Sequence, residues 1–239
     1  MSVLPTPAVS IVTSTYNRAQ VIRAAIESVL RQDFTNWQLC VVGDCTPDDT
    51  AGTIASYNDP RLEFYNLPEK SPPRAHGAIA KNHAIFKMAK APYIAYLDDD
   101  DIYRPNYLST MMGYLAQHPE AVFLYCRCMY RDKRTGRRVW GNPFQRWLHG
   151  YSREKLKRYN FIDTDCVIHK RSVLDEVGGW DPAYYFDDYE LWLRISEKHD
   201  LHYLNRVLVE KFVQEPPFLV RAFTKGLKIL RHGRTNPLE

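Results

Sequence analysis

Residues 93–101 read Tyr-Ile-Ala-Tyr-Leu-Asp-Asp-Asp-Asp. The first five form an apolar, aromatic-rich run typical of a buried strand, and four carboxylates follow directly. In an open α/β sheet, ligands bind at the carboxyl ends of the strands. Because adjacent like charges oppose one another's ionisation unless a cation is present, the run favours a hard divalent cation, Mn²⁺ or Mg²⁺. An acid run taken alone mainly indicates a solvated loop or a helix cap, and it is the position at the end of a strand that favours the cation.

The segments before this stretch alternate between strand and helix patterns. Short apolar runs at residues 9–13, 37–42 and 61–66 predict strands. Helical spacing or capping predicts helices over 18–31, from Thr46 onward, and over 75–89, with Thr46 as the N-cap of the second. Strands that alternate with helices form a mostly parallel sheet covered on both faces, so the predicted fold class is α/β.

The pattern loosens after residue 101. Residues 104–117 predict a helix opened by a proline, and residues 122–130 with 137–140 predict a hairpin. No internal repeat, low-complexity tract or long Pro/Gly linker divides the chain. We therefore expect one domain over residues 1–239, with a second half of mixed strand directions.

Composition excludes several classes of protein. The chain has 239 residues, 45% hydrophobic and 25% charged, as in ordinary globular proteins. Its longest apolar run is short compared with the roughly 20 residues that span a bilayer, and no signal-peptide pattern opens it. The five cysteines include no CxxC pair, which favours free thiols in the cytoplasm over a disulfide framework or a zinc site. A net charge of +4 is too small to indicate a nucleic-acid partner.

Five blocks follow one another in a specific order. They are Val-Ser-Ile-Val-Thr-Ser-Thr-Tyr-Asn-Arg (9–18), Val-Val-Gly-Asp-Cys-Thr-Pro-Asp-Asp-Thr (41–50), Ala-Lys-Asn-His-Ala-Ile (80–85), the strand and acid run (93–101), and Gly-Gly-Trp-Asp (178–181) followed by Asp-Asp-Tyr-Glu-Leu-Trp-Leu-Arg (187–194). Together they resemble the inverting family-2 glycosyltransferases of the GT-A fold. The resemblance implies a Rossmann-like, mostly parallel sheet flanked by helices, with a nucleotide-sugar-binding half at 9–103 and a mixed acceptor-binding half at 104–215.

The same resemblance assigns roles to the four carboxylates Asp98 to Asp101, called the acid run below. Asp98 and Asp100 correspond to the DxD motif, with Asp98 near the donor ribose and Asp100 on the metal that bridges the diphosphate. Asp99 is expected to lie beside the donor and to contribute less than Asp100 to the effect of the metal on donor binding. A UDP-sugar is the favoured donor.

The nucleotide is expected along the ends of the first two strands. Thr15, Tyr16, Asn17 and Arg18 offer hydroxyls, an aromatic face, an amide and a charge beside a helix N-terminus. On local grounds the same residues would suit an ordinary turn that caps a helix.

Two further donor-binding residues rest on the resemblance. Asp44 corresponds to the acid that accepts the imide N–H of uracil, although Gly43 and Cys45 depart from the family's usual Asp-Asp-Gly-Ser. Lys81 stands where the family usually has an arginine that reaches the nucleotide or diphosphate; it keeps the charge and loses the bidentate fork.

The catalytic base must lie on the acceptor side, because inversion by a single displacement needs a carboxylate opposite the leaving group. Asp187 and Asp188 open a predicted helix and follow an aromatic stretch, 180–186, suited to a sugar platform. Both could instead only cap that helix. The resemblance assigns the base to Asp188 and acceptor contacts to Asp187, Asp181 and Trp180, with a glycan or lipid-linked glycan as acceptor.

Three other features carry expectations. The aromatic and basic residues of 140–159 suit a loop over the sugar or a satellite hydrophobic cluster. His149 and His169 lack ligand spacing and are expected to be structural. Residues 216–239 predict a basic amphipathic helix that packs on the domain or lies on an anionic membrane surface, and the final Leu238-Glu239 resembles a cloning scar.

The predicted function is metal-dependent, inverting transfer of a sugar by a cytoplasmic enzyme, with peripheral membrane contact through 216–239. A nucleotidyltransferase shares the sheet and the acids, but it would normally show a glycine-rich phosphate loop where residues 13–18 contain no glycine. A non-catalytic nucleotide-sugar-binding protein of the same fold is the other alternative.

Overall fold

The computed structural model describes residues 5–75, 77–139, 150–184 and 187–214. Its strands are β1 (Val9–Thr15), β2 (Trp37–Gly43), β3 (Leu62–Asn66), β4 (Tyr93–Tyr96), β5 (Ile102–Tyr103), β6 (Phe123–Asp132), β7 (Arg138–Val139), β8 (Val167–Lys170) and β9 (His202–Val213). Its α-helices are α1 (Ile22–Leu30), α2 (Thr50–Ala55), α3 (Ala78–His83), α4 (Tyr107–Gln117), α6 (Arg153–Leu156), α7 (Val173–Val177) and α8 (Asp187–Lys198).

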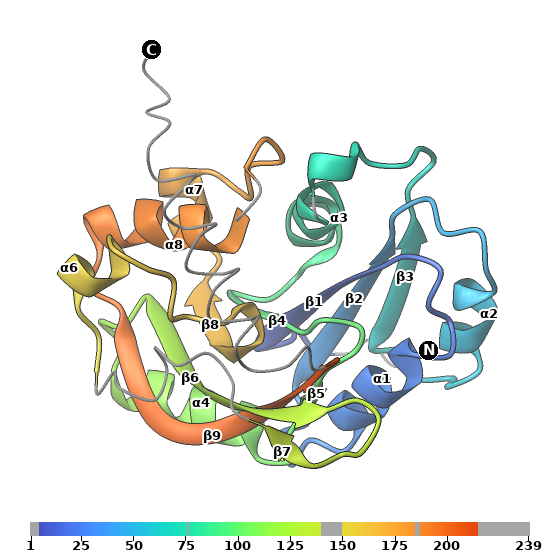
Figure 1. Cartoon of the computed structure of the whole chain (residues 1–239), viewed down its shortest axis with the longest axis horizontal. Coiled ribbons are helices and arrows are strands. Elements are labelled where there is room, and N and C mark those ends of the chain that lie inside the picture. Colours follow the sequence, from blue (N-terminus) through green and yellow to red (C-terminus); the bar gives the residue numbers. More distant parts are fainter. Residues whose placement is uncertain (1–4, 76, 140–149, 185–186, 215–239) are drawn as a thin grey trace.

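The strands form one sheet in the order β3-β2-β1-β4-β8-β6-β9-β5, with β7 paired to β6. Strands β1 to β4 are mutually parallel, whereas β8 runs antiparallel to both β4 and β6. The long β9 lies parallel to β6 and antiparallel to β5, and it curls around one side of the molecule (Figure 1). The predicted α/β class, with a parallel first half and a mixed second half, is confirmed, and β6 and β7 form the predicted hairpin.

Helices cover both faces of the sheet, and each face has its own core (Figure 1). Helices α1 and α4 bury Ile26 and Met111 against one face. Helices α3, α7 and α8 bury Ala80, Leu174 and Trp192 against the other. This two-layer burial leaves the carboxyl ends of β1, β2 and β4 at one edge, as in parallel sheets generally.

The first two predicted helices begin later than expected. Helix α1 starts at Ile22 rather than at residue 18, because Asn17 has a left-handed φ of 53° and a turn follows it. Helix α2 is capped by Asp49, whose side chain accepts from the Gly52 amide at 3.1 Å. The Thr46 hydroxyl instead accepts from the Asn17 amide at 2.8 Å, so it joins the loops after β1 and β2.

The predicted helix over 75–89 is divided into three pieces. A 3₁₀ turn at Pro73–Ala75 precedes α3, and a π-helical turn at Ala84–Met88 follows it. Gly77 separates the first two with a φ of 86°, and a Cβ there would lie 2.8 Å from the Ser14 hydroxyl. Gly77 therefore allows α3 to approach β1 closely.

All five cysteines are free and four are buried, as expected. Within the described ranges, no helix has the length and apolarity needed to cross a membrane. The predictions for 216–239, for His149 and for most of the aromatic part of 140–159 lie outside the described residues.

Candidate active site

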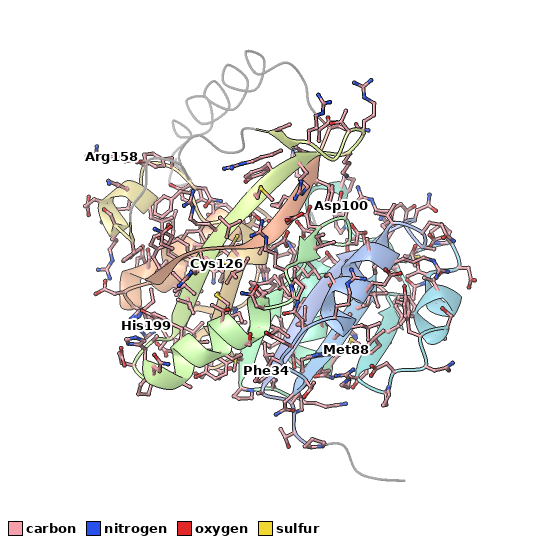
Figure 2. All side chains as sticks on the ribbon, turned by 90° about the horizontal axis from the view of Figure 1, so that it is seen from below. Phe34, Met88, Asp100, Cys126, Arg158 and His199 are labelled. Carbon is pink, nitrogen blue, oxygen red and sulfur yellow. The ribbon has the colours of Figure 1, made fainter. Side chains whose placement is uncertain are left out.

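The acid run leaves the end of β4 with its side chains pointing to different partners. Asp99 turns inward and accepts from the Thr15 hydroxyl at 2.6 Å and from Arg18 at 2.7 Å. Asp100 lies 2.6 Å from the Lys133 ammonium and 3.3 Å from Arg18. Figure 2 shows Asp100 near the end of the β6–β7 hairpin. The loop after β1 and the hairpin therefore meet at the acid run, and Thr15 and Arg18 lie beside it.

A lysine from β9 lies among four carboxylates behind the run. The Lys211 ammonium is 3.3 Å from Asp98, 2.7 Å from Asp101, 2.9 Å from Asp163 and 2.7 Å from Asp165. Its side chain is only 14% exposed. The Asp165 carboxylate also accepts the Asp98 amide at 2.8 Å. This lysine therefore fixes the loop after β4 against the segment before β8.

The charges of this cluster shift its titration. Burial alone would lower the pKa of Lys211, but the four carboxylates raise that pKa well above its usual value. Burial and the neighbouring Asp98 raise the pKa of Asp165 well above its usual value, although Lys211 acts in the opposite direction. One ammonium cannot neutralise four carboxylates, so the cluster attracts further positive charge.

The donor set fits an oxygen-coordinated cation. Carboxylate oxygens of Asp98, Asp101 and Asp165 lie within 4.8 Å of one another. Because Lys211 already contacts all three, the most accessible oxygens belong to Asp98 and Asp100, whose side chains are 43% and 21% exposed. Hard cations such as Mg²⁺ and Mn²⁺ prefer such ligands and keep open positions for phosphate or water.

The second predicted part of the donor site lies after β2. The Asp44 carboxylate accepts from the Ser71 amide at 2.9 Å and lies 3.0 Å from the Lys70 ammonium, which also sits over the ring of Tyr16. Burial acts to raise the pKa of Asp44, but these Ser71 and Lys70 contacts hold it below its usual value. Asp44 is therefore ionised at neutral pH and able to accept another N–H.

The structure explains the departure at Gly43. A Cβ at this position would lie 2.6 Å from the Asn66 side-chain oxygen and 2.9 Å from the Thr46 methyl. Asn66 accepts from the Thr46 amide at 2.8 Å and donates to the Thr46 carbonyl at 3.0 Å. The asparagine thus fills the space that an acid would need and holds the loop containing Asp44.

Helix α3 directs Lys81, predicted as a donor-binding residue, toward the start of α8. Its ammonium lies 3.5 Å from the Asp187 carboxylate and 4.0 Å from the centre of the Trp180 ring. The charge of Lys81 acts to lower the pKa of both Asp98 and Asp188. Lys81 therefore lies between the acid run and the start of α8, and links the two predicted halves of the site.

Asp188 is held in place at the first turn of α8. Its carboxylate accepts from the Tyr189 amide at 2.7 Å, the Asn160 amide group at 3.1 Å and the Thr164 hydroxyl at 3.3 Å. Burial, followed by the charge of Asp187, raises the pKa of Asp188 to about 6. An oriented carboxylate that titrates near neutral pH has the properties of a general base.

The other two predicted acceptor residues have structural contacts. Trp180 is 2% exposed and donates through its indole N–H to the Tyr96 hydroxyl at 3.2 Å, so little of its ring is available to a ligand. Asp181 accepts from the Ala183 amide at 2.9 Å and shapes the turn after Trp180.

His169 is structural, as expected. It is fully buried, with Nε2 2.7 Å from the Tyr96 hydroxyl and Nδ1 2.8 Å from the Lys170 carbonyl oxygen. Burial lowers its pKa to about 4, so the ring is neutral at pH 7.

Sequence reasoning missed several residues around these carboxylates. Asp163 and Asp165 form a second Asp-x-Asp pair just before β8. This pattern in the sequence could have identified them as candidate site residues. Lys211, within the long β9 strand, carries no local signal. Asn160, which holds Asp188, is likewise an ordinary loop residue in the sequence.

Several known proteins with similar sequences are named as glycosyltransferases. The chain is 36% identical over 121 residues to the putative colanic acid biosynthesis glycosyl transferase WcaA of Escherichia coli K12, covering 50% of this chain and 42% of the relative. It is 27% identical to the UDP-Glc:alpha-D-GlcNAc-diphosphoundecaprenol beta-1,3-glucosyltransferase WfgD of Escherichia coli, covering 82% of this chain and 73% of the relative. Of the first curated relatives that it matches, the chain spans only 42%, 65% and 63% of their lengths.

Solved structures show the same fold. Residues 1–349 of S. aureus TarS in complex with UDP-GlcNAc superpose with a TM-score of 0.72 at 17% identity, covering 97% of this chain and 68% of that TarS fragment. A mannosyltransferase of Pyrobaculum calidifontis in complex with GDP-Man and Mn²⁺ gives a TM-score of 0.66 at 19% identity, covering 94% of this chain and 65% of that protein. The predicted GT-A fold is thereby confirmed.

The sequence model described as "Glycosyl transferase family 2" matches residues 10–178. This match covers β1 to α7, including both loops of the candidate donor site and the acid run. The chain therefore belongs to glycosyl transferase family 2.

Proposed function

We propose that this chain is a metal-dependent, inverting glycosyltransferase that moves a sugar from a UDP-sugar to a hydroxyl of a glycan or lipid-linked glycan. The observation that carries the proposal is Asp188, an oriented carboxylate with a pKa of about 6, placed near Lys81. On the other side of Lys81 lies the acid run at the end of β4. The charge of Lys81 thus acts on both the proposed base and the proposed site for the leaving diphosphate.

The reaction follows from these positions. Asp188 accepts the proton of the acceptor hydroxyl as its oxygen bonds to the anomeric carbon. The bond from that carbon to the diphosphate breaks on the opposite face, so the configuration inverts. Lys81 and Asp187 lie beside Asp188, where they would orient the acceptor.

The donor half of the site supports nucleotide binding. Tyr16 is 44% exposed and offers a ring to the base, and Asp44 offers an acceptor to the imide N–H of uracil. Asp98 and Asp100 would hold Mn²⁺ or Mg²⁺, which would offset the charge of the departing diphosphate. Arg18, held by Asp99 and 47% exposed, is near enough to the run to contact a phosphate.

The acceptor class rests on the relatives' printed functions. WfgD acts on a diphosphoundecaprenol-linked GlcNAc, and WcaA is assigned to colanic acid biosynthesis. We therefore propose an acceptor of the polysaccharide-precursor class, used at the cytoplasmic side of a membrane. Membrane contact through residues 216–239 remains a prediction, testable by sedimentation with anionic vesicles.

The direct test is transfer in vitro. The chain is incubated with Mn²⁺, a UDP-sugar and a GlcNAc-diphospholipid, and UDP release that requires the lipid is measured. NMR of the product then gives the anomeric configuration, which we expect to be opposite to that of the donor. If UDP does not raise the thermal unfolding midpoint with Mn²⁺ present, the donor proposal is wrong.

Removing divalent cations should weaken UDP binding at least tenfold, because the acid run and a diphosphate repel each other. Calorimetry of UDP binding in Mn²⁺ and in EDTA measures this directly. Asp100→Ala should abolish the difference, whereas Asp99→Ala should reduce it less. Equal UDP affinity in Mn²⁺ and EDTA would contradict the prediction.

Asp44 should select uridine and thymidine diphosphates over guanosine diphosphate by roughly tenfold or more. The larger guanine ring presents its N–H groups at other positions, so the partly buried Asp44 carboxylate would lose the hydrogen bond that the imide N–H of uracil or thymine donates. Binding of UDP, TDP and GDP is compared with Mn²⁺ present. Asp44→Asn should narrow the difference. The mannosyltransferase neighbour was crystallised with GDP-Man, so tighter GDP binding is a real alternative and would refute the assignment.

A further inference from the structure

A second group of metal-type ligands lies away from the acid run. His118 directly follows α4, Glu120 comes two residues later, and His202 is the first residue of β9. One ligand atom from each lies within 4.8 Å of the others. Lys211, which contacts the acid run, is near the opposite end of the same strand, so the two groups are separated by most of the length of β9 (Figure 1).

The backbone holds these three residues in place. The His118 amide donates to the Tyr114 carbonyl at 3.0 Å, and the Ala121 amide donates to the His118 carbonyl at 2.9 Å. His202 is in register with Leu124 in the β6–β9 pairing. The group therefore lies between the end of α4 and the start of β9, where main-chain hydrogen bonds hold the backbone of His118 and Ala121 and strand pairing holds His202.

Tyr114 orients both imidazoles. Its ring stacks on His118 with centroids 4.2 Å apart and an interplanar angle of 27°, and it meets His202 edge-on at 5.9 Å. Its hydroxyl lies 3.1 Å from Nδ1 of His202. When Nδ1–H of His202 donates to this hydroxyl, Nε2 keeps a lone pair that can bind a metal. Many metal-binding histidines donate their other ring N–H to a neighbouring group in this way.

These three ligands suit a cation of borderline hardness. Two imidazoles and one carboxylate suit Zn²⁺, Co²⁺ or Ni²⁺, whereas Mg²⁺ prefers oxygen ligands alone. The His118 and Glu120 side chains are 41% and 63% exposed, so an ion can enter from solvent. Ligand atoms of a tetrahedral Zn²⁺ lie about 3.4 Å apart, so these side chains must close by at most about 1.4 Å.

We propose that His118, Glu120 and His202 form a zinc-type site that clamps the end of α4 to the start of β9. Solvent completes the coordination shell, because these residues supply three ligands. The site is separate from the oxygen-ligand site of the acid run, and the two should differ in the metals they prefer.

The test uses the full chain with Zn²⁺ and Co²⁺ as probes. We expect Zn²⁺ to raise the thermal unfolding midpoint and His118→Ala to reduce that rise, whereas any rise caused by Mg²⁺ at the acid run should be the same in His118→Ala as in the wild-type protein. Bound Co²⁺ should give visible ligand-field absorption without a thiolate charge-transfer band. His118→Ala, His202→Ala and Glu120→Gln should each weaken Zn²⁺ binding tenfold or more, and Tyr114→Phe by about 10–100-fold, the usual effect of losing an outer-shell partner.

A matched control comes from a second exposed histidine–carboxylate pair. His199 and Glu176 lie 3.0 Å apart, and neither belongs to a three-ligand group among the described residues. His199→Ala should therefore leave Zn²⁺ binding unchanged, and so should Asp100→Ala at the acid run. Because His118 and Glu120 are exposed, their variants should fold even if His202→Ala does not.

Three results would overturn the proposal. The first is Zn²⁺ affinity that is unchanged in His118→Ala and Glu120→Gln. The second is an equal loss in His199→Ala. The third is a Co²⁺ spectrum with a thiolate band that disappears in Cys45→Ser, which would assign the metal to the partly exposed cysteine.

Discussion

Replacing Lys211 with methionine should lower the free energy of unfolding by about 3–5 kcal/mol, the usual loss when one partner of a buried ion pair is removed. Methionine keeps most of the side-chain volume and removes the ammonium. The carboxylates of Asp98, Asp101, Asp163 and Asp165 would then face one another without their common partner. Urea unfolding at pH 7 measures the change.

Lys133 provides a matched control, because it also pairs with the acid run. Its ammonium lies 2.6 Å from Asp100, but its side chain is 36% exposed. Lys133→Met should therefore change stability by less than about 1 kcal/mol, as exposed pairs usually do. Equal effects of Lys133→Met and Lys211→Met would show that burial of the Lys211 cluster has no energetic consequence.

Acid should rescue Lys211→Met. Burial already raises the folded-state pKa values of Asp101 and Asp165, and loss of the ammonium removes the charge that opposes this rise. The resulting destabilisation is present at pH values above the unfolded pKa values. As pH falls from 7 to 5, protonation removes the unpaired charge, so the difference from the wild-type protein should shrink. Asp165→Asn should partly restore stability in the variant for the same reason.

Local patterns predicted the parts of the fold that follow from nearby residues. The apolar run before Asp98 indicated β4, and the acids at 187–188 marked the start of α8. Both features depend on neighbours within a few positions. The start of α1 was predicted too early, because the left-handed conformation of Asn17 is stabilised by Thr46, which lies in another loop.

Contacts between distant strands could not be predicted in this way. Lys211 reaches Asp98 only because β8 lies between β4 and β6 and because β9 pairs with β6 so that Lys211 lies opposite Tyr130. The role of Asn66 beside Gly43 likewise requires the parallel pairing of β2 with β3. These arrangements depend on sheet order, which hydrophobic patterns leave undetermined.

The raised pKa of Asp188 predicts how transfer depends on pH. A base must be ionised to accept a proton, and burial together with Asp187 places this pKa at about 6. With saturating metal, kcat/KM should therefore fall about tenfold for each pH unit below 6. A rate that stays level down to pH 5 would show that this carboxylate does not act as the base.

Asp188→Asn should lower turnover by a factor of 100 or more, because the amide cannot accept the proton of the acceptor hydroxyl. The substitution is nearly isosteric and removes a charge that burial disfavours, so the unfolding midpoint and UDP affinity should change little. Asp175→Asn, at an exposed position on α7, serves as the matched control and should keep wild-type turnover. The rate that remains in Asp188→Asn should also lose its dependence on a group with a pKa near 6, which a purely structural role would not alter. If Asp188→Asn transfers sugar at close to the wild-type rate with saturating donor, Asp188 is not the base, and Asp187, beside Lys81, is the next carboxylate to replace.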